Sequence, residues 1–135
     1  KEIGLGSNRI GEAGAGSIAE ALKANSTIAT LDLECNGIGP DGASALAEAF
    51  KVNDTIQSVS LWRNSVGDAG AQALAEALKS NKSIVHFDLS ANQITAAGMR
   101  ALAEGLKANG AVRVLNLRNN DFGDAGAQAL AEALK

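Results

Sequence analysis

The residues of this chain that could carry out catalysis do not have the spacing of an active site. Ser60, His86 and either Asp88 or Asp32 could on paper supply the nucleophile, base and acid of a hydrolase. Strand positions on an open sheet, however, offer no enclosed pocket and no oxyanion donors. His86 is the only histidine, so a zinc site would lack its further ligands, and the single cysteine, Cys35, is distant from it in sequence. We therefore expect no catalytic residue, no metal and no cofactor.

The residue types that dominate protein interfaces form a more promising pattern. Trp62 is the only tryptophan, and Arg63 follows it directly. Truncation of an exposed Trp or Arg at an interface often costs about 2 kcal/mol or more of binding energy. Whether these side chains can reach a partner depends on the elements that carry them.

Those elements follow from a repeat of 28 residues, which five regularly spaced asparagines define. Each asparagine follows a segment such as Leu31-Asp-Leu33, whose alternation of apolar and polar residues is typical of a half-buried strand. Each unit then continues into a helical pattern, as in residues 40–51, where Pro40 suits the first turn. Strands joined by such crossovers must run parallel. The asparagines are Asn8, Asn36, Asn64, Asn92 and Asn120.

The unit L-x-x-L-x-L-x-x-N-x-I, followed by G-A-x-A-L-A-E-A-L-K, resembles a leucine-rich repeat of the ribonuclease-inhibitor type. The resemblance covers the whole chain and implies an α/β fold: a right-handed solenoid, or horseshoe segment, with a parallel concave sheet and convex helices. Within this subclass, the chain most closely resembles the repeat domains of NOD-like receptors. Ran GTPase activators belong to the same subclass. We expect a single domain, 1–135, that is a fragment of a longer protein. Its units are 1–27 (truncated), 28–55, 56–83, 84–111 and 112–135 (incomplete).

Residues that keep the 28-residue period are interpreted as scaffold. The repeat-defining asparagines are expected to satisfy buried backbone groups, and periodic glycines such as Gly70 to lie where a Cβ would collide with the sheet or the next helix. Pairs such as Glu76 and Lys79 are expected on a solvated convex face. Thr95 is expected to cap the fourth helix. Asn53 and its equivalents are expected to end the helices with left-handed backbone, and the glycosylation sequons there are interpreted as repeat consensus.

The residues that vary between repeats lie on the outward side of the strands, where the scaffold does not dictate them. Trp62 is the sharpest candidate for recognition among them. The alternative is that its ring lies flat over neighbouring strand side chains and only covers the sheet. The partner-binding residues predicted for the concave face are Asp32, Glu34, Trp62, Arg63, His86, Asp88 and Arg118.

The composition narrows the kind of partner. A net charge of −3 disfavours nucleic acid, and no apolar run is long enough for a membrane helix. A single cysteine is typical of a reducing compartment, so we expect a cytoplasmic protein. The predicted function is binding of a protein partner on the concave face, like the sensing domain of a NOD-like receptor of innate immunity. Two alternatives remain: a GTPase-regulating protein of the Ran activator kind, and a structural or engineered array that self-associates through uncapped ends.

Overall fold

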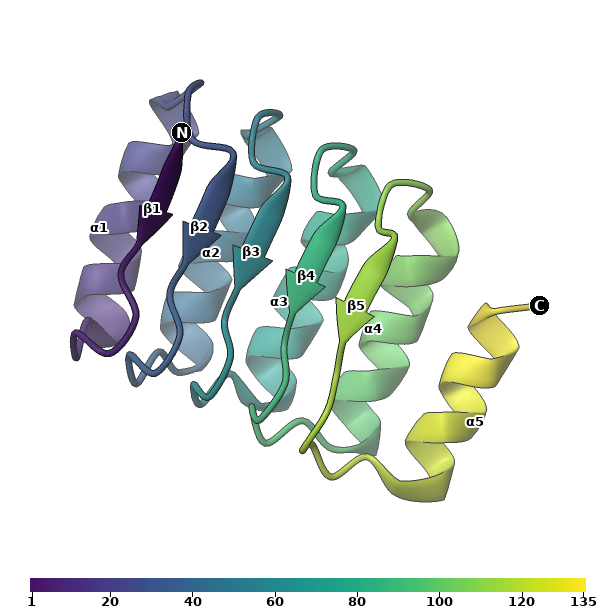
Figure 1. Cartoon of the computed structure of the whole chain (residues 1–135). Coiled ribbons are helices and arrows are strands. Elements are labelled where there is room, and N and C mark those ends of the chain that lie inside the picture. Colours follow the sequence, from purple (N-terminus) through teal and green to yellow (C-terminus); the bar gives the residue numbers. More distant parts are fainter.

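Strands and helices alternate five times along the chain, as the repeat predicts (Figure 1). The computed structural model describes residues 1–135. Each strand has three residues and each helix 11 to 14, and no helix is long and apolar enough to cross a bilayer. The elements are β1 Glu2–Gly4, α1 Gly11–Ala24, β2 Thr30–Asp32, α2 Pro40–Val52, β3 Ser58–Ser60, α3 Gly67–Ser80, β4 His86–Asp88, α4 Ala96–Ala108, β5 Val114–Asn116 and α5 Gly123–Ala133.

The five strands form one parallel sheet in sequence order. Adjacent strands pair in the register of the repeat, so that Leu31 lies beside Val59 and Val59 beside Phe87. These central side chains are buried, whereas the residues on either side of them face away from the helices. Figure 1 shows all the helices on one face of the sheet and the other face uncovered. The predicted fold, a repeat solenoid with an inner parallel sheet and outer helices, is confirmed.

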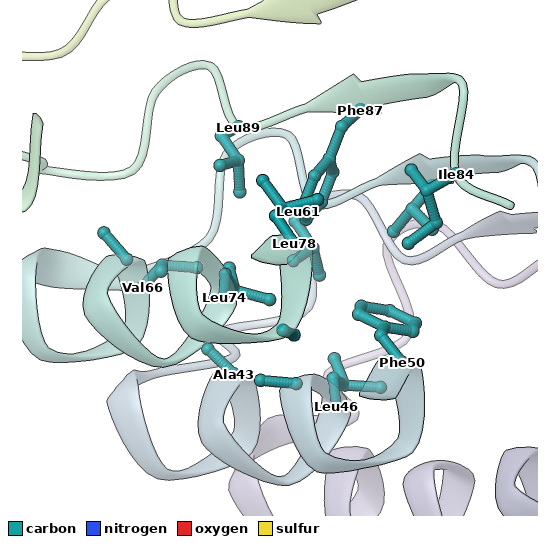
Figure 2. Close-up of a cluster of buried hydrophobic side chains, with 14 of the residues drawn as sticks. Ala43, Leu46, Phe50, Leu61, Val66, Leu74, Leu78, Ile84, Phe87 and Leu89 are labelled. Carbon is teal, nitrogen blue, oxygen red and sulfur yellow. The ribbon is translucent and has the colours of Figure 1, made fainter. Parts of the chain in front are cut away.

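One hydrophobic core fills the space between the sheet and the helices (Figure 2). The ring of Phe87 from β4 meets the ring of Phe50 from α2 edge-on, with centroids 6.3 Å apart and planes at 88°. Burial decreases toward both ends of the solenoid: Leu61 is 0 % exposed, but Leu5 and Leu117 in the terminal repeats are only partly buried. The central repeats therefore provide the best-packed part of the sheet.

Glycine recurs in the first turn of the helices because neighbouring elements approach closely there. A Cβ added to Gly70 would lie 2.9 Å from the Cβ of Ala43 in the preceding helix and 2.7 Å from Val66 Cγ1 in its own repeat. The predicted collision is thus confirmed, but its partners are the preceding helix and the residue that closes the turn, rather than the sheet. Gly105 permits a still closer approach, since a Cβ there would lie 2.6 Å from the Ala75 carbonyl oxygen.

The repeat-defining asparagines form a series of hydrogen bonds after the strands, which is buried in the central repeats and which we call the exit ladder (Asn8, Asn36, Asn64, Asn92 and Asn120). Asn64 Oδ1 accepts the backbone N–H of Asn36 at 3.1 Å and of Ile38 at 2.9 Å, both in the preceding repeat. Its Nδ2 donates to the carbonyl oxygens of Leu33 and Leu61, each at 3.0 Å. The predicted scaffold function of these asparagines is confirmed.

A second series, the entry ladder (Asn25, Asn53, Asn81 and Asn109), precedes the strands. Asn53 Nδ2 donates to the carbonyl oxygens of Leu22 at 2.8 Å and Asn25 at 2.9 Å, and its Oδ1 accepts the N–H of Ile56 at 2.9 Å. The helices end at these asparagines, as predicted. The backbone at Asn53 is extended, with φ −83° and ψ 125°, and its equivalents are alike, so the left-handed conformation expected there is wrong. Left-handed backbone instead follows each strand, at Ser7, Cys35, Arg63, Ala91 and Asn119.

The turn into the helix alternates between two forms along the solenoid. Gly11, Gly67 and Gly123 open the odd-numbered helices with positive φ, which favours glycine. Gly39 and Thr95 precede the even-numbered helices with extended backbone. The Thr95 hydroxyl accepts the Ala97 N–H at 3.4 Å, which confirms its predicted capping function.

Acidic residues of odd-numbered helices reach across to the N-terminus of the next helix. Asp68 Oδ1 in α3 accepts the backbone N–H of Thr95 at 2.8 Å and of Gly98 at 3.0 Å, and its Oδ2 accepts the Thr95 hydroxyl at 2.7 Å. Burial by itself raises the pKa of Asp68, but the hydrogen bonds from Thr95 and Gly98 together lower it below its ordinary value. Glu12 in α1 accepts the N–H of Gly42 in the same manner. The helices are thereby linked in pairs.

Candidate protein-binding surface

All seven predicted binding residues come from the strands or from the three residues after them. The strand register aligns Asp32, Ser60 and Asp88 in one row across the uncovered face, and it places the exposed His86 in a neighbouring row. The structure brings four of the seven to one hollow and His86 to an adjoining one, whereas Asp32 and Arg63 line neither.

The first hollow, of about 270 Å³, is lined by Glu34, Trp62, Asp88 and Arg118 together with smaller polar residues. By register, Ser90 lies between Trp62 and Arg118, and it is only 3 % exposed. Adjacent strands are about 4.8 Å apart, so the backbones at Trp62 and Arg118 lie roughly 10 Å apart, on either side of this serine. Trp62 is half-buried, so part of its side chain is available to solvent.

A second hollow, of about 300 Å³, continues the first across β3, β4 and β5. The two share Ser60, Asp88 and Asn116, and the second adds the exposed side chains of His86 and Val114. Val114 is 49 % exposed and therefore offers apolar surface on this face. Together the hollows form one shallow trough over the last three strands, which we call the concave trough.

One row of the uncovered face has a structural function that sequence reasoning missed. Asp32 Oδ1 accepts the Glu34 N–H at 2.9 Å, and Asp88 Oδ1 accepts the Ser90 N–H at 2.8 Å. Ser60 forms the equivalent, longer contact to the Trp62 N–H. Asp, Ser and Asn share the ability to accept the N–H two residues ahead, and this shared chemistry was the available signal. Asp32 and Asp88 therefore have a structural function. This differs from our expectation that the fold places no requirement on the residue types in this row.

The other charged side chains of this face have no ion-pair partner, whereas several of those on the helices are paired. Four of the five predicted Glu–Lys pairs at a spacing of three residues form, for example Glu76 and Lys79 at 2.6 Å, whereas Glu104 and Lys107 do not pair. The chain forms no other ion pair, so Glu34, Arg63 and Arg118 are not neutralised within the molecule. These groups remain available to a partner.

The arrangement does not assemble a hydrolase triad. Asp88 Oδ1 accepts the N–H and hydroxyl of Ser90, and its Oδ2 accepts Asn116 Nδ2 at 2.8 Å. Its hydrogen bonds therefore go to neighbours other than His86 or Ser60. No group of three His, Cys, Asp or Glu side chains is placed to hold a metal ion.

Two of the glycosylation sequons are incompatible with glycan attachment in the folded chain. Asn53 and Asn81 are each 4 % exposed. The amide nitrogen that would carry the sugar donates within the entry ladder, from Asn81 to the carbonyl oxygens of Phe50 and Asn53. The sequons recur because each repeat needs this asparagine for the hydrogen bonds of the entry ladder.

The sequence matches the family model described as "Leucine Rich repeat" over residues 24–47, 52–75, 80–103 and 112–131. These segments make up more than half of the chain, so the chain belongs to the leucine-rich repeat family. No curated protein matches it.

Solved structures share the fold. The structure of leiomodin-1 actin-binding site 2 has a TM-score of 0.80 and 23 % identity, and the match covers 98 % of this chain and 80 % of that one. The tropomodulin C-terminal domain of Caenorhabditis elegans has a TM-score of 0.82 and 16 % identity, with 99 % and 81 % covered. At these identities the likeness shows the fold alone. Neither protein is a NOD-like receptor, and the comparisons do not support the predicted resemblance to that class or a place in innate immunity.

Proposed function

We propose that this chain is a protein-binding module that holds a partner against the uncovered face of its sheet. The observation that carries the proposal is the hollow in which Glu34 and Arg118, both without an ion pair, lie beside the half-buried Trp62. Trp and Arg are enriched among the residues that dominate binding energy. The two asparagine ladders hold both ends of the strands, so little conformational entropy is lost when this surface binds.

Actin is the first partner to test. One of the similar structures is named for an actin-binding site, and that likeness guides the choice of assay. A cytoplasmic location, expected from the single cysteine, would suit such a partner. No residue of the concave trough favours the sensing function of a NOD-like receptor or GTPase regulation of the Ran activator kind.

The test compares three forms of the chain. The first is the wild type, the second carries Trp62→Ala with Arg118→Ala, and the third carries Gln72→Ala with Arg100→Ala on the helices. The helix variant also removes one exposed arginine, and therefore controls for loss of positive charge. Each form is mixed with filamentous actin and sedimented, and each is used to enrich partners from a cell extract.

We expect a protein that the wild type and the helix variant retain and that the trough variant loses. Its purified form should bind the trough variant at least about 30-fold more weakly, which corresponds to about 2 kcal/mol. Circular dichroism would confirm that both variants are folded. Equal affinity of all three forms for every enriched protein would contradict the proposal.

A further inference from the structure

Charge is separated along the uncovered face of the sheet. The acidic side chains that it carries without an ion pair, Glu2, Asp32 and Glu34, belong to the first two repeats. The exposed guanidinium groups of Arg63 and Arg118 belong to the third and fifth repeats.

Asp88 is the one acidic residue of this face outside the first two repeats, and its carboxylate accepts hydrogen bonds from neighbouring residues. Three donors surround its carboxylate: the Ser90 N–H, the Ser90 hydroxyl and Asn116 Nδ2. Hydrogen bonds of this kind hold a carboxylate within the scaffold and reduce what it can offer to a partner. Among the charged side chains that line the first hollow, the negative Glu34 and the positive Arg118 form neither an ion pair nor a side-chain hydrogen bond within the molecule.

The distance between these two charges sets a spacing for whatever binds them. Glu34 follows β2 and Arg118 follows β5 at the same register position, so three strand spacings separate them, or roughly 14 Å. An extended peptide advances about 3.3 Å per residue and covers that distance in about four residues. Trp62 follows β3 and lies between them, with apolar ring surface exposed.

The concave trough consists of two small adjoining hollows, which suit single side chains of an extended segment. Its two hollows measure about 270 and 300 Å³. An extended segment that crosses the strands places individual side chains in the hollows.

Resting on the proposed function, we propose that the partner supplies an extended segment of defined charge order. A basic side chain of the segment pairs with Glu34, an apolar one contacts Trp62, and an acidic one about four residues from the basic one pairs with Arg118. A segment in the opposite orientation would bring like charges together, so the same groups fix the direction in which it lies.

The test is selection of random nine-residue peptides displayed on phage. Selection is carried out on the wild-type chain and on the charge-reversed variants Glu34→Lys and Arg118→Glu. Arg100→Glu on α4 is the matched control for Arg118→Glu, because it makes the same change in net charge on the opposite face. Affinities of selected peptides are then measured by fluorescence polarisation.

We expect wild-type selections to be enriched in peptides with a basic and an acidic residue about four positions apart. Each reversal on the uncovered face should weaken such a peptide at least 10-fold, and reversal of the matching peptide residue should restore its affinity. Arg100→Glu should change the affinity less than 2-fold.

The remaining outcomes separate this inference from the proposed function. Peptides that require Trp62 but show no charge order would overturn the inference and leave the proposed function intact. Peptides that bind the Trp62→Ala variant with the same affinity as the wild type would contradict both the inference and the proposed function. Failure to select any peptide would overturn the extended-segment inference, and enrichment of whole proteins would still decide the function.

Discussion

Replacement of Asn64 by alanine should destabilise the chain strongly, because it removes the central member of the exit ladder. The side chain is 5 % exposed. Its loss leaves the N–H groups of Asn36 and Ile38 without their acceptor, at a cost of about 1–3 kcal/mol for each buried donor. The carbonyl oxygens of Leu33 and Leu61 each keep another asparagine donor. We therefore predict a decrease of about 2–6 kcal/mol in the free energy of unfolding.

The assay is urea unfolding followed by far-ultraviolet circular dichroism, and the chain contains its own control. Asn8 belongs to the same ladder but is exposed, and its side chain only donates, to the carbonyl oxygens of Leu5 and Gly6. Asn8→Ala should therefore cost no more than about 1 kcal/mol. Asn64→Asp, which keeps the acceptor, should fall between the two. Equal destabilisation by Asn64→Ala and Asn8→Ala would refute the reasoning that buried acceptors hold the turns.

Other predictions concern the helices. Gly70→Ala should lower the free energy of unfolding by about 1–3 kcal/mol, because its Cβ would lie 2.9 Å from that of Ala43. Gly16→Ala, where nothing lies within 4 Å, should raise it by about 0.5–1 kcal/mol; the opposite order in urea unfolding would contradict the close packing. The lowered pKa of Asp68 means that its charged form stabilises the fold above the ordinary pKa of about 3.9 and that this contribution is lost as the pH falls through the folded-state value. The stability advantage over Asp68→Asn should thus be steady near pH 6 and decrease as the pH falls below the ordinary pKa. An advantage that is unchanged by acid would show that the charge is not its source.

Much of the fold could be predicted because the same apolar pattern recurs in each repeat. Leu31 and Leu33 alternate with polar residues, and the structure buries them to 1 % and 0 % exposure. The entry ladder was harder to predict, because asparagine is also common where helices end in left-handed backbone. The extended backbone at Asn53 goes with a hydrogen bond to the start of the next repeat, where Asn53 Oδ1 accepts the N–H of Ile56.

The candidate site could be predicted only in outline. The 28-residue register alone predicted that Glu34, Trp62 and Arg118 share one face, and they line one hollow. The structural function of Asp32 depends on a local hydrogen bond that its residue type allows but does not require. The capping function of Asp68 depends on the distance between two helices, which no pattern in the sequence contains.

Amide NMR of the chain titrated with the partner found by the enrichment experiment tests most directly whether the concave trough is the binding surface. The single tryptophan supplies one indole N–H signal, so Trp62 can be followed without ambiguity. Binding should shift that signal and the backbone amides of Ser90 and Arg118, while the amide of Gln72 on α3 stays unchanged. Shifts confined to helix amides, with the Trp62 indole signal unmoved, would contradict the assignment.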